Sequence, residues 1–218
     1  MASDTSATWP PASGLTTPFV PREESLMTLA ASTRIYAHAS VVFDTVLDVS
    51  NYGKWNSFCP KVTIAQQPDS LAGSQKLELG TSFVFHVIMD SNKPQSQNAT
   101  QLKVSDISTP SSDSAYIPQE TVEKDGSYTS DPSKVYRIGW RSDGGLISKG
   151  LRAERFHEVI VLGDNECEVR TWENQAGVLV HIVKWMYQKT LEGKFKMWCN
   201  DLKKFCEEKV KAGGNLEG

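Results

Sequence analysis

Residues 153–175 constrain the fold more than any other part of the chain. They contain the run RFHEVIVL, a turn at residues 163–165 with the sequence GDN, and the run ECEVRTWE. Two strand-like runs joined by a short glycine-containing turn predict a hairpin of two long antiparallel strands. Because successive side chains of a strand point to opposite faces, a register with Leu162 opposite Glu166 gathers apolar side chains on one face. That face carries Val159, Val161, Cys167 and Val169.

The same register places ionisable side chains on this apolar face, toward the open end of the hairpin. Arg155 falls opposite Glu173, and His157 falls opposite Thr171. Ionised groups on the inner face of a sheet are costly unless they are paired or bind something. Arg155, His157 and Glu173 are therefore the candidate catalytic residues. The other face of the hairpin is expected to meet water, and it carries Glu158, Glu166, Glu168 and Arg170.

Two interpretations stay open for these side chains. Arg155 and Glu173 either form a structural ion pair that closes one end of the sheet, or they hold an oxygen atom of a ligand inside an apolar cavity. His157 is either a general base that titrates near neutrality or a core histidine that shares a hydrogen bond with Thr171.

Composition divides the chain into three parts. Residues 1–25 are a flexible leader rich in Pro and Ser, residues 26–211 form one domain, and residues 212–218 are a disordered tail. Within the domain, residues 108–133 form an insertion rich in Ser, Asp and Pro. A long segment of this composition is expected to be a flexible loop rather than a lid over a site.

Hydrophobic periodicity predicts the helices and strands of the domain. Strands are expected over residues 26–37, 61–67, 76–79, 82–90, 99–107 and 134–141, followed by the two strands of the hairpin. Two short helices are expected after the first strand, one capped by Ser40 and one over residues 52–58. A long helix is expected over residues 178–211, with an apolar stripe of Leu179, Ile182, Val183, Met186, Leu191, Phe195, Trp198, Leu202 and Phe205.

This order of elements predicts an α+β fold in which one long helix closes a curved antiparallel sheet. Such a sheet leaves a space beneath the helix, and a small molecule would bind there. The aromatic face of residues 82–90 is expected to line that space, which turns His86 away from it. The residues expected to contact the ligand are Phe83, Phe85, Val87, Met89, Tyr136, Ile138, Trp140, Thr171 and Trp185.

Charge and motifs argue against several classes of function. The 218 residues carry a net charge of -3, which gives no support for a nucleic-acid partner. No apolar run approaches about 20 residues and no secretory signal is present, so we expect a cytoplasmic protein without integral membrane association. The four histidines lack the spacing of metal ligands, and no nucleotide-binding motif occurs, so neither a metal nor a cofactor is expected. The thiols are expected to be free, and they belong to Cys59, Cys167, Cys199 and Cys206.

Three segments resemble one known family. SVVFDTVLDVSNYGKWNSFCP resembles the opening of START-like (SRPBCC) domains, AERFHEV with CEVRTWENQAG resembles their late hairpin, and VKWMYQKTLEGKFKMWCNDLK resembles their last helix. The resemblance covers about residues 26–210. It implies a helix-grip fold, in which a seven-stranded antiparallel sheet wraps around the C-terminal helix. It also implies a hollow interior, which the family's lipid carriers, ubiquinone-binding proteins, pollen-allergen-like binders and polyketide cyclases or dehydratases share.

The polar groups on the inner face and the predicted hollow favour an enzyme of secondary metabolism, a cyclase or dehydratase that needs no cofactor. Its partner would be a hydrophobic, oxygenated small molecule such as a polyketide, and the protein would be a monomer or homodimer. His157 or Glu173 would remove a proton beside a carbonyl group, and Arg155 would stabilise the enolate. The alternatives are a carrier that binds a lipid, sterol or quinone without chemistry, and an interaction domain with a filled core.

Overall fold

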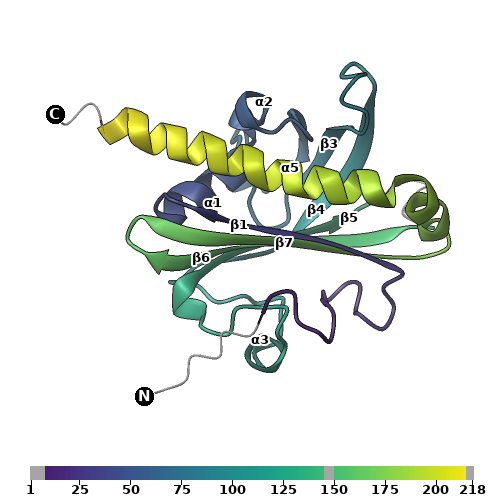
Figure 1. The fold of residues 1–218 in the computed structure, drawn as a ribbon, viewed down its shortest axis with the longest axis horizontal. Helices are drawn as coiled ribbons and strands as arrows, with labels where there is room; N and C mark the ends of the chain where they lie inside the picture. The colour runs from purple at the N-terminus through teal and green to yellow at the C-terminus, as the bar shows by residue number, and fades with distance from the viewer. Residues whose placement is uncertain (1–7, 145–149, 215–218) are drawn as a thin grey trace.

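The computed structural model describes residues 8–144 and 150–214. In these residues seven strands form one curved antiparallel sheet in the order β1-β7-β6-β5-β4-β3-β2, and the helix α5 lies across one of its faces (Figure 1). This arrangement confirms the predicted helix-grip fold. The strands are β1 (Met27–Ile35), β2 (Lys61–Gln66), β3 (Ser82–Ile88), β4 (Gln97–Ser108), β5 (Val135–Ser142), β6 (Arg152–Gly163) and β7 (Glu166–Ala176).

The hairpin of β6 and β7 has the predicted register over most of its length. Arg155 pairs with Glu173 and His157 pairs with Thr171, as the alternation of side chains requires. At the turn the register shifts by one residue, so that Gly163 rather than Leu162 lies opposite Glu166. The shift is a β-bulge, which leaves Leu162 unpaired beside the turn while the longer part of the ladder keeps its register.

The helices lie close to their predicted places. Those after the first strand are α1 (Ala39–Leu47), η1 (Val49–Asn51) and α2 (Tyr52–Trp55), and α5 spans Val180–Gly214. The cap of α1 is His38 instead of Ser40, because the His38 ring nitrogen Nδ1 accepts the backbone N–H of Ser40 at 3.3 Å. Residues 76–79 do not form a strand and contribute only a bridge between Asp48 and Lys76. Because α5 continues to Gly214, the predicted tail begins within the helix, and residues 215–218 lie outside the described part of the chain.

The core fills one end of the grip. It lies between α1, the C-terminal half of α5 and the concave face of the sheet. Its members include Val42, Phe43 and Val46 of α1, Ile138, Val159 and Val169 of the sheet, and Trp198, Cys199, Leu202 and Cys206 of α5. All four cysteines of the chain are buried free thiols. The interior under the N-terminal half of α5 is therefore the part left to form a cavity.

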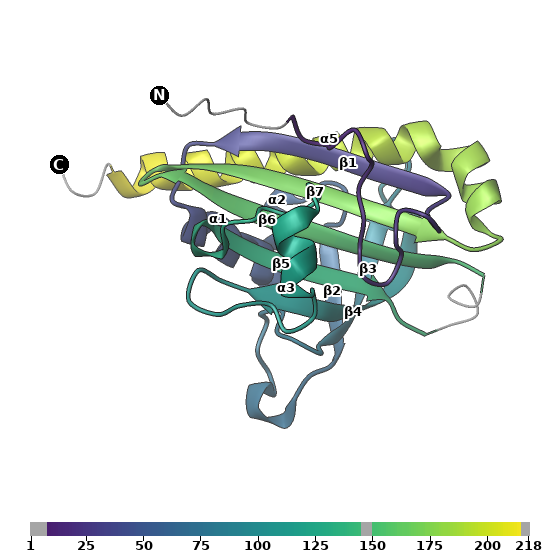
Figure 2. The ribbon, with the colours of Figure 1, turned by 90° about the horizontal axis from the view of Figure 1, so that it is seen from below.

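The convex face of the sheet is covered, in contrast to the prediction that it meets water. Residues 8–25 and the insertion lie across it, and the insertion contains the helix α3 (Gln119–Lys124) (Figure 2). A second apolar cluster fills the space between them and the strands, and it comprises Leu15, Ile117, Val122, Tyr128, Phe156 and Trp172. The described part of the leader and the insertion are thus packed structure rather than flexible chain, because each buries apolar side chains against the sheet.

Glu158 shows the consequence for charged side chains on this face. It is fully buried, and its carboxylate forms an ion pair with Arg137 at 2.7 Å and accepts a hydrogen bond from Arg137 Nε at 2.8 Å. The backbone N–H of Thr129, in the insertion, donates to the same carboxylate at 3.1 Å. Sequence alternation alone placed Glu158 on the correct face but not in its correct environment, because the covering segments come from elsewhere in the chain.

Candidate functional site

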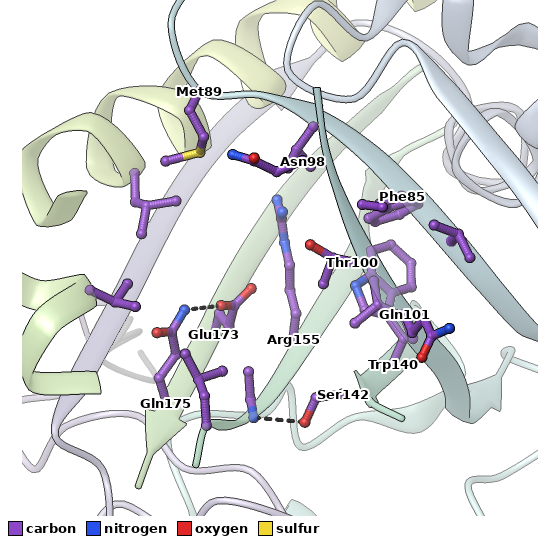
Figure 3. Close-up of a pocket in the computed structure, with 18 of the residues that line it drawn as sticks. Phe85, Met89, Asn98, Thr100, Gln101, Trp140, Ser142, Arg155, Glu173 and Gln175 are labelled. Carbon is purple, nitrogen blue, oxygen red and sulfur yellow. Dashed lines mark hydrogen bonds between the residues drawn. The ribbon is translucent and has the colours of Figure 1, made fainter. Parts of the chain in front are cut away.

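A cavity of about 760 Å³ lies between the concave face of the sheet and the N-terminal half of α5 (Figure 3). This volume is in the range of small-molecule sites in proteins. Its walls are mainly apolar, and its polar side chains come from four neighbouring strands and the helix. The polar lining residues are Asn98, Thr100 and Gln101 of β4, Ser142 of β5, Arg155 of β6, Glu173 and Gln175 of β7, and Tyr187 of α5.

The predicted aromatic face of β3 lines this cavity in part. Phe85 packs edge to face on Trp140, with 5.4 Å between ring centroids, and both rings form the wall. Val87 of β3 and Met89, just beyond the end of that strand, continue the wall. His86 points to the other side, where its ring shares a hydrogen bond with Thr63 at 3.0 Å. The period of two along β3 therefore separates Phe85 and Val87, which line the cavity, from His86, which does not.

Arg155 enters the cavity from β6 (Figure 3). Its Nε donates a hydrogen bond to Thr171 Oγ1 at 3.0 Å, and its guanidinium carbon lies 3.9 Å from the ring centroid of Phe195. The side chain is only 5% exposed, yet its Nη2 has no hydrogen-bond partner among the described residues. The guanidinium is thus held in position by one hydrogen bond and by two aromatic rings, those of Phe195 and Trp198, with donors left for a ligand.

Glu173 enters from β7, at the position paired with Arg155. Among the described residues the two do not form an ion pair within 4.0 Å, and Glu173 instead accepts a hydrogen bond from the side-chain amide of Gln175. Burial raises the pKa of Glu173, an effect that the positive charge of Arg155 and the bond from Gln175 partly offset. The structure therefore brings two predicted residues together without neutralising either one, and leaves them facing the same apolar space.

His157 does not line the cavity. It is fully buried between two indole rings, with centroid distances of 4.4 Å to Trp140 and 4.6 Å to Trp198. Its ring nitrogens find no hydrogen-bond partner within residues 8–144 and 150–214, so the predicted bond to Thr171 is not formed. Burial, together with the charge of Arg155, holds the pKa of His157 well below its ordinary range. His157 is therefore a neutral side chain of the core, and it lies behind the cavity wall.

Several other residues predicted to contact the ligand also lie elsewhere. Phe83 lies behind the wall against Phe85, Tyr136 packs on Phe43, Ile138 is fully buried in the core, and Thr171 is buried beneath Arg155. Trp185 is 85% exposed on the outer side of α5. Ile182 and Met186 of the predicted apolar stripe are 55% and 51% exposed. The inward line of α5 runs through Val183, Tyr187 and Leu191, and the exposed residues lie roughly 100° or more around the helix from this line.

Sequence reasoning missed the polar rim on β4. Thr100 pairs with Phe85 and Asn98 pairs with Val87, and paired residues share a face of the sheet. Asn98 and Thr100 therefore face the cavity although both belong to a segment of polar, exposed residues. No hydrophobic pattern marks them, and only the register of β3 against β4 identifies them. The helical spacing from Val183 through Tyr187 and Leu191 to Phe195 could have identified the lining of α5.

Other kinds of site find no support in the described chain. Within residues 8–144 and 150–214 there is no group of three or more His, Cys, Asp or Glu side chains arranged to hold a metal ion. The helices of the same residues include none with an apolar run sufficient to span a bilayer. The arrangement is a mainly apolar cavity with one cation, one carboxyl group and several neutral polar groups.

Known proteins place this geometry in a family. No family model matches the chain. It is 31% identical over 204 residues to oxopyrrolidines biosynthesis cluster protein O of Penicillium oxalicum, a match that covers 88% of this chain and 93% of that protein. The structure of a hypothetical protein from Helicobacter pylori superposes with a TM-score of 0.61 at 15% identity, over 94% of this chain and 99% of that chain.

The Zhui aromatase/cyclase of Streptomyces sp. R1128 superposes with a TM-score of 0.57 at 12% identity, over 86% of this chain and 98% of that chain. Identities this low report a shared fold and not a shared reaction. The Penicillium match shows that the chain belongs to the same family as that protein, and the superpositions, together with the sheet order and the gripped helix, show that it shares the helix-grip fold of the Zhui aromatase/cyclase.

Proposed function

We propose that this protein is a biosynthetic enzyme that binds a hydrophobic, oxygenated small molecule and removes a proton beside one of its carbonyl groups. The observation that carries the proposal is the arrangement of Arg155 and Glu173. From paired positions on β6 and β7 they reach into an apolar cavity without closing on each other in the described structure. A cation and a base held apart in a water-poor site are the groups that enolate chemistry needs.

The known relatives support a place in secondary metabolism. The Penicillium protein is named for a cluster of oxopyrrolidine biosynthesis, and the Streptomyces protein is an aromatase/cyclase. Both names concern the assembly of small natural products. We therefore propose a cyclase- or dehydratase-like reaction on a molecule with at least two carbonyl groups.

Each residue has a distinct role in this reaction. The carboxylate of Glu173 takes the proton from the carbon between or beside the carbonyl groups, and the pair of electrons moves to the carbonyl oxygen. Arg155 binds that oxygen through its unused N–H groups and stabilises the enolate. The enolate carbon then forms a bond to a second carbonyl carbon, whose oxygen receives the proton back from Glu173. Burial favours this cycle, because a raised pKa makes Glu173 a stronger base than an exposed carboxylate.

The apolar walls contribute orientation. Phe85, Trp140 and Leu191 exclude water from the reacting chain and fold it so that its two carbonyl groups meet. Holding both reacting carbons in one cavity makes ring closure close to unimolecular. His157 takes no part in this proposal, since it is outside the lining and neutral.

The test is ring formation from a soluble poly-β-ketone, followed by liquid chromatography and mass spectrometry. We expect Glu173→Gln to lower the turnover number by about 100-fold or more, while binding of the ketone changes little. The matched control is Glu168→Gln, which makes the same chemical change on the convex side of the same strand. A Glu173→Gln protein with the turnover of the wild type would end the catalytic proposal.

A second candidate function is a carrier without chemistry. The predominance of apolar side chains in the lining favours it, since such a cavity would hold the hydrophobic part of a lipid, sterol or quinone. Native mass spectrometry of freshly purified protein distinguishes the two. An unchanged lipid at one per chain, with no conversion of the offered ketone, would favour the carrier.

A further inference from the structure

The guanidinium of Arg155 lacks a counter-charge in contact with it. It is 5% exposed, only its Nε donates a hydrogen bond within the described chain, and that bond goes to the neutral hydroxyl of Thr171. The remaining buried cation on this sheet, Arg137, is closed against Glu158 at 2.7 Å. Five N–H donors are available on an arginine, so most of those of Arg155 are free to bind an added group.

The groups around Arg155 do not supply the missing negative charge. Burial raises the pKa of the Cys59 thiol and of the Cys199 thiol to about 12, and it raises the pKa of Tyr52 further, so all three stay neutral. Glu173 is the acid nearest in the ladder, and it makes no ion pair with Arg155 within 4.0 Å among the described residues. A cation in this position is costly without an anion beside it, and the cavity is the direction from which an anion can come.

Gln175 places a second requirement on the chemistry of the ligand. Its amide nitrogen donates to Glu173, and its Oε1 is buried without a hydrogen-bond partner in the part of the chain that is described. Gln175 lies two residues along β7 from the partner of Arg155, which makes the two diagonal neighbours, roughly 7–8 Å apart. One compact polar group of a ligand can reach both. An unpaired carbonyl oxygen accepts from an N–H or O–H, so this position calls for a donor.

We propose that the natural ligand is an amphiphilic acid whose head presents an anionic oxygen to Arg155 and an adjacent N–H or O–H to Gln175. The anionic oxygen belongs to a carboxylate or to an acidic enol. This inference rests on the ligand-binding role proposed above and names the class of molecule that fills the cavity. It places the head between β6 and β7, beside Phe195.

The rest of the cavity fits the remainder of such a molecule. Away from Arg155, the walls are formed by Val87 of β3, by Met89 just after that strand, and by Val183 and Leu191 of α5. These side chains accept an alkyl or aryl chain, whose burial contributes roughly 0.8 kcal/mol per CH₂ group. An anion bound beside Glu173 raises the pKa of that carboxyl group further, so the same binding mode strengthens the proposed base.

The experiment compares three probes by isothermal titration calorimetry at slightly alkaline pH and below their micelle-forming concentrations. N-dodecanoylglycine carries both a carboxylate and an N–H, its methyl ester lacks the charge, and dodecanoate lacks the N–H. We expect N-dodecanoylglycine to bind at one per chain, about tenfold or more tighter than its ester. We expect dodecanoate to bind with intermediate affinity, because it leaves Gln175 Oε1 unpaired.

Variants assign these differences to the two side chains. Arg155→Met should bring the acid and the ester within about twofold of each other, while the ester keeps its wild-type affinity. Gln175→Leu should remove the advantage of N-dodecanoylglycine over dodecanoate. The matched control is Arg170→Met, an arginine on the convex side of β7, which should keep the preference for the acid. Arg155→Met should melt no lower than the wild type, because it removes a buried charge that has no partner.

Equal affinity of the wild type for acid and ester would overturn the inference. So would an acid preference that survives in Arg155→Met, or the absence of binding of all three probes. The experiments also distinguish failure of this inference from failure of the proposed reaction. A protein that prefers the acid but converts no ketone keeps this inference and loses the enzyme, and a protein that cyclises ketones without preferring the acid does the reverse.

Discussion

Two neighbouring residues of β6 show how differently the two faces of the sheet treat charge. Glu154 points to the convex face and is fully buried. Its carboxylate accepts hydrogen bonds from the backbone N–H of Phe19 at 2.8 Å, from Ser105 Oγ at 2.8 Å and from the Tyr116 hydroxyl at 3.0 Å. Arg155 points to the concave face, is almost as buried, and makes one hydrogen bond within the described chain.

This difference in hydrogen bonding indicates that the buried charges of the convex face stabilise the fold, whereas Arg155 on the concave face serves to bind a ligand. On the convex face, residues 8–25 and 108–133 bring partners to the carboxylates of Glu154 and Glu158 and to the side-chain amide of Asn174, so that these polar groups hold the two segments in place. On the concave face, Arg155 and Gln175 keep polar atoms without partners in the described structure. Folded proteins satisfy nearly all buried polar groups, and the exceptions call for an explanation. Here the explanation is a ligand that completes the concave face as the two segments complete the convex one.

The largest expected effect is that of breaking the convex network at Glu158→Ala. The change leaves Arg137 buried without its carboxylate, which should lower the free energy of unfolding by about 3–5 kcal/mol. Urea unfolding followed by circular dichroism measures it. The control is Glu120→Ala, which removes an exposed ion pair with Lys124 and should cost less than about 1 kcal/mol. Equal effects of the two variants would contradict a structural role for the convex charges.

A smaller effect is expected from Leu15→Ala in the covering segment. Leu15 is 3% exposed against the sheet, and its loss should lower the free energy of unfolding by about 2–3 kcal/mol. Leu79→Ala, at a residue that is 55% exposed, should change it by less than about 0.5 kcal/mol. If both variants unfold at the same urea concentration as the wild type, then residues 8–25 do not contribute to the stability of the convex face.

The smallest effect is a pH dependence on the concave face. Burial raises the pKa of Glu173 in the folded state above its ordinary value of 4.5, so folding favours the protonated form. The wild type therefore loses stability relative to Glu173→Gln as the pH rises from that ordinary value through the raised one, and the two are alike at lower pH. Unfolding of both proteins at about pH 4 and about pH 8 measures this. A difference in stability that does not change with pH would show that Glu173 is not buried in the way described.

Much of the site could be predicted from residues 153–175. Their alternation gave the register that pairs Arg155 with Glu173, and both residues line the cavity. The same alternation on β3 separates Phe85 and Val87, which line the cavity with Met89 beyond the end of the strand, from His86, which does not. These predictions depend on which face a side chain takes, and that is fixed by the geometry of a strand and by the partner opposite it.

The predictions that the structure does not follow concern depth and distance. His157 and Thr171 are on the correct face, but they sit beneath Arg155 and the indole of Trp198, which fill the space above them. Trp185 points to solvent, since the rotation of α5 about its axis is set by its contacts with β1 and the core rather than by its own pattern. A local sequence pattern indicates the face on which a side chain lies, but it does not indicate whether residues from other segments cover that side chain.

By itself, the sequence determined the seven strands that form the sheet, the long helix and the register of most of the last hairpin, and therefore which side chains share a face, because these follow from local periodicity. Only the tertiary structure decided what lies over each face. The backbone of Phe19 reaches Glu154 across 135 residues of chain, and Lys194 of α5 reaches Ser91 across 103. Contacts between such distant segments depend on the packing of the whole fold, and they made one face of β6 a closed structural layer and left the other as a cavity with an unpaired cation.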